Sequence, residues 1–190
     1  MNPSERDRRR TRIAELLPEV ELIGSSDWRK AVIDIWDEVW AESEWGDPEA
    51  CPKSHKQVLD SSNVLHTRSV TQQALATAEI VERLHGAAVD RDVLVSGCLL
   101  HDVSKLVECR PSDEGVATSH LGDLIQHGVY AAHKALAHGL PESVAHILIS
   151  HTHASRTVPA TIEAIIVHYV DFLDSDVLLQ QRGIRLFAKG

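Results

Sequence analysis

Ionisable side chains interrupt apolar helical stretches at several places in this chain. Residues 98–105 read CLLHDVSK, in which His101 and Asp102 follow an apolar run and Lys105 comes three positions later. Burying an uncompensated carboxylate costs several kcal/mol. A helix with this sequence therefore needs a partner for its charges, and either a nearby lysine or a metal ion would serve.

Hydrophobic periodicity predicts helices along most of the chain, whereas strand signals such as Asn-Gly turns and long alternating runs are nearly absent. Residues 46–58 and the polar segment 110–119 are predicted to be loops. The predicted helices span residues 4–17, 27–45, 62–85, 91–108, the stretch after residue 119 up to Gly139, 141–150 and 159–181. We therefore expect an all-α fold of about seven helices.

The sequence pattern divides the chain into a working core and two flanking parts. Residues 59–182 hold most of the unusual ionisable groups, residues 1–58 form an N-terminal helical extension, and residues 183–190 form a C-terminal tail. All four tryptophans lie in the extension, and we expect their stripe to pack it onto the core. An alternative is that Trp40 or Trp45 closes over a ligand site in the core, which would make the extension a determinant of specificity.

Composition excludes several classes of protein. The 190-residue chain has a net charge of −9, which disfavours general binding of nucleic acid, and we expect the basic run 6–12 to be a solvated helix face rather than a contact for a partner or polyanion. No 18-residue apolar stretch and no secretory signal are present, so no membrane association is expected. Three widely spaced cysteines indicate a reducing compartment, and we expect a cytoplasmic protein.

Histidine is strongly enriched in the core. Of 12 histidines, 11 lie from His66 to His168, and such a concentration favours a metal site. His66 lies early in one predicted helix, and Asp171 lies inside the apolar stretch of another. One site with nitrogen and oxygen ligands would consist of His66, His101, Asp102 and Asp171. This donor set suits Mn²⁺, Fe²⁺, Co²⁺, Ni²⁺ or Zn²⁺.

Two further histidines stand at the ends of predicted elements. His127 precedes Gly128, and His151 ends the apolar run AHILIS. Together they could bind a second metal if Asp102 bridges the pair. Five further histidines of this region, His120, His133, His138, His146 and His153, are expected to be surface or packed core residues.

The ordered set H…HD…H…H…D over residues 62–175 resembles the HD superfamily of metal-dependent phosphohydrolases. The local strings HTRSVTQQALATA, LLHDVSK, HGVYAAHKAL, ISHTHAS and IIVHYVDFLDS carry the resemblance. Within the superfamily, the chain looks most like small bacterial enzymes that hydrolyse symmetrical dinucleoside tetraphosphates. The resemblance implies an HD-type helical bundle, and the N-terminal extension lies outside it.

The resemblance also implies roles for individual residues. One or two divalent metals, with iron or manganese favoured, would activate a water that attacks phosphorus beside Asp102, and Lys105 would stabilise the phosphoryl charge. The expected substrate is a small nucleotide-like phosphoester or phosphoanhydride. Further contacts to it are expected from Arg68, Lys134, Arg156 and His168.

Two other functions use features of the same sequence. Mixed-valent diiron oxygenases that cleave C–P or C–C bonds share this fold and ligand order, and oxygen dependence would distinguish them. A non-catalytic HD module that binds a metal or ligand is the second alternative. The amphipathic surface of residues 27–45 could also support a homodimer.

Overall fold

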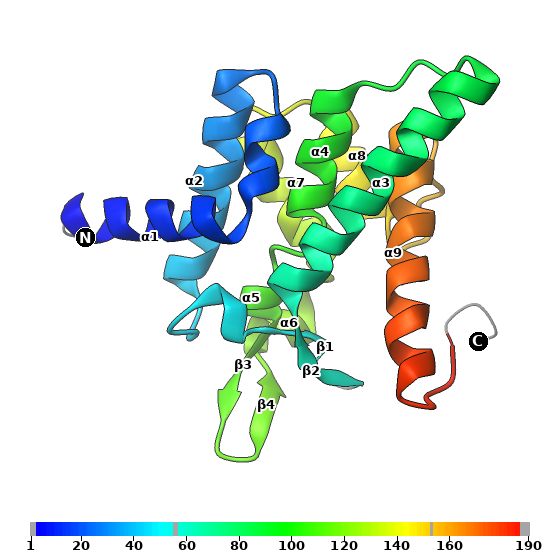
Figure 1. The fold of residues 1–190 in the computed structure, drawn as a ribbon. Coiled ribbons are helices and arrows are strands. Elements are labelled where there is room, and N and C mark those ends of the chain that lie inside the picture. The colour runs from blue at the N-terminus through cyan, green and yellow to red at the C-terminus, as the bar shows by residue number, and fades with distance from the viewer. Residues whose placement is uncertain (1–2, 55–56, 153, 187–190) are drawn as a thin grey trace.

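Helices make up most of the structure, a computed structural model that describes residues 3–54, 57–152 and 154–186 (Figure 1). The α-helices are α1 (Pro3–Leu16), α2 (Ser26–Glu42), α3 (Asn63–His85), α4 (Arg91–Leu100), α5 (Lys105–Glu108), α6 (His120–Leu124), α7 (His127–Ala137), α8 (Glu142–Ser150) and α9 (Ile162–Gln181). Short 3-10 turns follow α1 and α2, namely η1 (Pro18–Leu22) and η2 (Pro48–Ala50). The predicted all-α class is confirmed. His153 and residues 187–190 of the predicted tail lie outside the described residues.

Two short antiparallel hairpins include part of the predicted loop 46–58 and most of the predicted loop 110–119, and the first hairpin runs on to residue 62. Strand β1 (Pro52–Ser54) pairs with β2 (Val58–Ser62), and β3 (Cys109–Ser112) pairs with β4 (Gly115–Thr118). The prediction of loops was wrong here, because strands of three to five residues are too short to show an alternating pattern. Both hairpins lie at the lower end of the bundle in Figure 1.

The predicted helix 91–108 is broken at its ionisable residues. Helix α4 ends at Leu100 and α5 begins at Lys105. In between, the backbone N–H of Val103 donates to Leu100 O at 3.2 Å, and that of Lys105 donates to Asp102 O at 3.0 Å. These bonds to the third preceding residue tighten the chain into a turn. Asp102 therefore projects from a turn rather than from a continuous helix.

Helix α4 lies in the interior of the bundle and packs against α2, α3, α8 and α9. Asp90 caps its start, because the side chain accepts from Val93 N at 3.0 Å. Thr161 caps α9 in the same way by accepting from Ala164 N at 3.1 Å. These caps fix where the two helices begin, and hence which of their residues face the centre of the bundle.

The N-terminal extension shares one hydrophobic cluster with the later helices. Trp36 is buried and its indole N–H donates to Leu99 O at 2.9 Å, while that of Trp45 donates to Cys109 O at 3.0 Å. The expected division at residues 58/59 falls inside β2. The tryptophans thus fasten the extension to the core, as the sequence predicted.

The basic run at the N-terminus also faces the protein. Arg9 contacts Asp37 of α2 at 2.6 Å, and Arg10 pairs with Asp34 of the same helix. Both aspartates are buried. The expectation of a solvated basic face was therefore wrong for these arginines, because two acids on α2 compensate them.

Candidate metal centre

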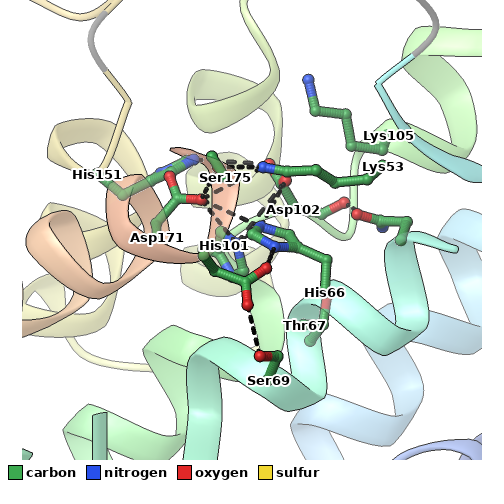
Figure 2. Close-up of polar contacts among 12 residues, drawn as sticks. Lys53, His66, Thr67, Ser69, His101, Asp102, Lys105, His151, Asp171 and Ser175 are labelled. Atoms are coloured by element: carbon green, nitrogen blue, oxygen red, sulfur yellow. Dashed lines mark hydrogen bonds and ion pairs between the residues drawn. The ribbon is translucent and has the colours of Figure 1, made fainter. Parts of the chain in front are cut away.

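Four helices and one turn bring the six predicted ligands together. His66 comes from α3, His101 and Asp102 follow α4, and Asp171 comes from α9. The remaining two are His127, the first residue of α7, and His151, which directly follows α8. Figure 2 shows the side chains of His66, His101, Asp102, His151 and Asp171 converging from these separate elements.

Four side chains surround the first candidate position. His66 Nε2 lies 3.2 Å from His101 Nε2, 3.0 Å from Asp171 Oδ1 and 3.6 Å from Asp102 Oδ2. His101 Nε2 lies 3.7 Å from the same oxygen of Asp102 and 3.9 Å from Asp171 Oδ1. Ligands about 2.1 Å from one cation are roughly 3 Å apart when they subtend a right angle. The set therefore has the dimensions of one coordination sphere.

The second candidate position uses the other oxygen of Asp102. Its Oδ1 lies 3.5 Å from His127 Nε2 and 3.6 Å from His151 Nε2. The two imidazole nitrogens are 3.1 Å apart. Asp102 consequently faces one histidine pair with each oxygen, which is the arrangement of a carboxylate that bridges two cations.

The hydrogen bonds of the rings decide what the converging nitrogens can bind. His101 Nδ1 donates to Cys98 O at 2.7 Å, and His151 Nδ1 donates to Leu148 O at 2.8 Å. His66 Nδ1 bonds to Asp174 Oδ2 at 2.6 Å. In these tautomers each Nε2 carries a lone pair, so lone pairs and carboxylate oxygens point at one another. A cation satisfies such a cluster of acceptors, and the residues present fit a divalent metal.

A glycine allows His127 to reach its partner. A Cβ at Gly128 would lie 2.3 Å from Leu148 O. Only glycine therefore lets the start of α7 lie this close to the end of α8, where His151 stands. Ser104 adds a second tie, since its hydroxyl donates to His127 O at 2.8 Å.

Burial and charge set the protonation states of the ligands. Burial lowers the pKa of His101 to about 4. Burial and the charge on Lys105 place the pKa of His127 well below its ordinary value. Burial opposes ionisation of Asp102, yet the neighbouring His101 and Lys105 hold the pKa of that carboxyl well below its usual range. Neutral imidazoles and an ionised carboxylate are the forms that bind metal.

Asp174 supports the first position from behind. It accepts hydrogen bonds from His66 Nδ1, from the Ser69 hydroxyl and from the Gln73 amide. A carboxylate behind a ligating histidine fixes the orientation of the ring and raises its basicity. Its position three residues after Asp171, on the same helix, is the one sequence feature that could have identified this residue.

A cavity of about 490 Å³ opens beside the six side chains. Its wall includes Asp102, His127, His151 and Asp171. The other lining residues are Lys53, Ser54, Gln57, Val58, Lys105, Glu108, Gly122, Gln126, Thr152, Ala154, Phe172, Ser175 and Leu179. Small-molecule sites have volumes of about 300–1,000 Å³, so a ligand of nucleotide size fits.

Lys105 lines this cavity, whereas two other cations predicted to contact substrate are paired with acids elsewhere. Arg68 pairs with Glu19 of η1 at 3.0 Å. Lys134 is held by Glu38 and Glu42, each at 2.6 Å. These two cations tie α3 and α7 to the N-terminal extension.

The remaining two residues predicted to contact substrate also differ from expectation. Arg156 is exposed in the connection after His151 and is not among the described residues that line the cavity. His168 Nδ1 bonds to His151 O at 2.8 Å, so it holds the backbone of a candidate ligand. Neither is placed by the structure against the cavity.

Lys53 and Glu108 are polar cavity residues that sequence reasoning missed. Lys53 lies on β1, in a segment predicted to be a loop of the extension. Glu108 pairs with Lys105 at 2.5 Å, and the spacing of three residues on one helix could have predicted that pair. Nothing in the sequence near Lys53 signals its contact with Ser175, which lies 122 positions away.

Comparison with known proteins shows the family of this chain. The profile of the family described as "HD domain" matches residues 64–176, more than half of the chain. The chain therefore belongs to the HD domain family. The matched segment contains all six candidate ligands and begins after the extension.

Curated relatives include two kinds of phosphoester-cleaving enzyme. A dihydroneopterin 2′,3′-cyclic phosphate phosphodiesterase of Methanocaldococcus jannaschii is 36% identical over 114 residues, covering 59% of this chain and 45% of the relative. The 3′-5′ exoribonuclease YhaM of Bacillus subtilis is 27% identical over 160 residues, covering 78% of this chain and 49% of the relative. The chain thus spans about half the length of the curated relatives it matches. No solved structure matched the chain.

Within the part of the chain that the structure describes, no helix has both the length and the apolar character needed to cross a membrane.

Proposed function

We propose that this chain is a metal-dependent phosphohydrolase that cleaves a phosphoester or phosphoanhydride of a small, nucleotide-like substrate. The observation that carries the proposal is the position of Asp102, whose two oxygens face two different histidine pairs at 3.5–3.7 Å. A bridging carboxylate beside a cavity of about 490 Å³ is suited to holding a phosphoryl group between two cations.

The protein side chains have separable roles in this proposal. His66, His101, Asp102 and Asp171 would hold one divalent cation, and Asp102, His127 and His151 would hold a second. Bound there, such cations supply an activated water and neutralise phosphoryl charge. Iron or manganese is favoured for this set of nitrogen and oxygen donors, and cobalt, nickel or zinc would also fit it.

Lys105 is proposed to stabilise charge on the substrate from the side of the second position. Burial lowers the pKa of Lys105, but Asp102 and Glu108 together raise it above the ordinary value, so the side chain remains a cation. Its ammonium group contacts Glu108 at 2.5 Å and borders the cavity. A substrate oxygen would therefore share this lysine with Glu108.

The named relatives support the reaction class. One acts on a cyclic phosphate and others are exoribonucleases, so phosphoester cleavage is common to them. The chain's net charge of −9 and the size of its cavity favour a small substrate over a long RNA. An RNA oligonucleotide nevertheless belongs among the substrates to be tested.

The proposal is tested by assaying a panel of phosphate compounds with Mn²⁺-loaded or Fe²⁺-loaded protein. The panel holds nucleoside mono-, di- and triphosphates, dinucleoside polyphosphates, 2′,3′-cyclic phosphates and a short RNA, each with and without oxygen. Release of phosphate or nucleotide without oxygen is the expected result. Metal-loaded protein that turns over none of these compounds would contradict the proposal.

Adding a phosphonate and a polyol to this panel separates the alternatives. Conversion of a phosphonate or polyol only when oxygen is present would identify a diiron oxygenase. Tight binding of a phosphate compound with no turnover under any condition would identify a non-catalytic module.

A further inference from the structure

Lys53 is a buried cation at the cavity that the family match does not account for. Its side chain is 9% exposed and lines the cavity beside Asp171 and Ser175. It comes from β1, before the matched segment 64–176 begins. In Figure 2 the ammonium group of Lys53 reaches toward Ser175 and Asp171, whereas the side chain of Lys105 extends away from them.

The contacts of Lys53 leave part of its hydrogen-bonding capacity for a ligand. Its Nζ donates to the Ser175 hydroxyl and lies 3.8 Å from Asp171 Oδ1. Among the described residues, Asp171 is the one carboxylate within 4.0 Å of this nitrogen. An ammonium group has three donors, and a distance of 3.8 Å is too long for a hydrogen bond.

The charge of Lys53 depends on an oxygen that the first metal position also uses. Asp171 Oδ1 lies 3.0 Å from His66 Nε2 and belongs to that coordination sphere. When Asp171 ligates a cation, its negative charge no longer compensates the lysine. A buried ammonium group then requires another anion.

Lys105, at the cavity, and Lys134, on α7, are already compensated by glutamates. Lys105 contacts Glu108 at 2.5 Å, and Lys134 contacts two glutamates at 2.6 Å. None of those three carboxylates belongs to the two candidate coordination spheres. Lys105 also faces Asp102, which belongs to both spheres, but Glu108 continues to compensate Lys105 when a metal binds. The one carboxylate near Lys53 is itself a candidate ligand, so Lys53 loses its compensation.

We propose that Lys53 binds a non-bridging oxygen of the substrate phosphoryl group at the first metal position. This inference rests on the proposed phosphohydrolase function and deepens it. It assigns the phosphoryl end of the substrate to the side of the cavity formed by Lys53 and Ser175. The apolar residues Val58, Phe172 and Leu179 also line the cavity and would contact the organic group. The substrate class is thus a phosphoester with a free anionic oxygen and one organic group of moderate size.

The test measures binding of inorganic phosphate to Mn²⁺-loaded protein by isothermal titration calorimetry, with metal content determined in parallel. Lys53→Met should raise the Kd for phosphate by at least about tenfold, because a charge-assisted hydrogen bond is lost. The metal content should stay at the wild-type level. Lys53→Gln can keep a polar contact with Ser175 without the charge and should weaken binding to a similar degree. This second variant keeps the test informative if the methionine variant misfolds.

The matched control is Lys30→Met. Lys30 is 68% exposed on α2, and its partner Asp34 is also paired with Arg10. This variant removes one positive charge far from the cavity and should leave phosphate binding unchanged.

Three results would overturn the inference. They are an unchanged Kd in both Lys53 variants, a loss of metal that accounts for the weaker binding, and an absence of phosphate binding by the metal-loaded wild type. Wild-type protein that binds phosphate through Lys53 but hydrolyses no phosphoester would instead contradict the proposed function and leave the Lys53 site standing.

Discussion

The candidate metal centre and the cavity wall beside it are built from different kinds of structure. The centre draws its side chains from α3, α7 and α9 and from the residues that directly follow α4 and α8, with ring nitrogens fixed by backbone carbonyls or by Asp174. The wall takes its two lysines from β1 and from the four-residue helix α5. The metal ligands are thus held by the packing of the helices, whereas the two lysines of the wall depend on short elements, although Phe172, Ser175 and Leu179 of the wall also belong to α9.

This difference separates metal binding from phosphate binding. Ligands that must converge within a few tenths of an ångström are placed on or beside rigid helices. The two lysines proposed to contact phosphoryl oxygens lie on short elements, which can change without disturbing the core. On this view the helices define the metal positions and the short elements define how the phosphoryl group is held.

The largest expected effect comes from Asp102, because one side chain serves both candidate positions. Asp102→Ala should remove metal from the protein and reduce phosphoester hydrolysis to the background rate. Metal content by mass spectrometry and turnover measured on the same sample provide the check. Asp7→Ala, which removes an exposed acid on α1, is the control. Retention of both metal and activity in Asp102→Ala would refute the assignment.

A smaller effect is expected when Asp174, which orients the ring of His66, is changed. Asp174→Asn leaves all six ligands in place but removes the carboxylate that orients His66. The affinity for the first metal should fall by about 10–100-fold, as is typical for partners of ligating histidines. Metal titration followed by calorimetry would show this as one weakened site and one unaffected site. Equal weakening of both sites would contradict the separation of the two coordination spheres.

A substitution of Lys105 tests the role of the cavity wall rather than that of the metal ligands. Lys105→Ala should keep the metal and lower kcat by about tenfold, through loss of one charge-assisted contact. Its effect on phosphate binding should be smaller than that of Lys53→Met, since Glu108 already compensates Lys105. Steady-state kinetics and phosphate titration of both variants would establish the order. An unchanged rate would leave Lys105 as no more than the ion-pair partner of Glu108.

The smallest expected effect is a pH dependence of the metal-free protein. Burial lowers the pKa of His101 to about 4 and also lowers that of His127. The unfolded chain, with histidine near its ordinary value of 6.5, then binds more protons than the folded chain between pH 6.5 and 4. The free energy of unfolding should therefore fall as the pH falls through this range.

His66 opposes that trend in part. Burial and Lys53 lower its pKa, but Asp171 and Asp174 raise it overall, so its contribution is lost as the pH rises. Because the pKa is lowered for two of these histidines and raised for one, urea denaturation should show a lower free energy of unfolding at pH 5 than at pH 7. Higher stability at pH 5 would mean that His66 dominates. His101→Asn should make the dependence shallower.

The sequence predicted the centre better than the wall for a physical reason. A histidine or aspartate inside an apolar helical run stands out against its neighbours, and this contrast marked His66, His101 and Asp171. The break after Leu100 was not visible, because residues 101–104 contain no glycine or proline and Val103 and Leu106 continue the helical spacing of the apolar residues. Lys53 lies on a three-residue strand and depends on a contact 122 positions away, so no local pattern could reveal it.

Arg68 and Lys134 were predicted to contact substrate, but the structure pairs both of them with acids. Arg68 lies two residues after the candidate ligand His66, and Lys134 lies six residues after Gly128; both were expected to reach substrate. Each instead pairs with glutamates of the N-terminal extension, Glu19 for Arg68 and Glu38 and Glu42 for Lys134. A cation near a motif is therefore informative only when the acids that can compensate it are known.

The central claim is that Asp102 joins two metal positions. Anomalous X-ray diffraction from crystals of the protein loaded with Mn²⁺ or Fe²⁺, collected at the absorption edge of the metal, tests it directly. The account predicts two peaks about 3.5–4 Å apart, one on each side of the Asp102 carboxylate. No peak at Asp102, or metal bound only at other residues, would contradict it.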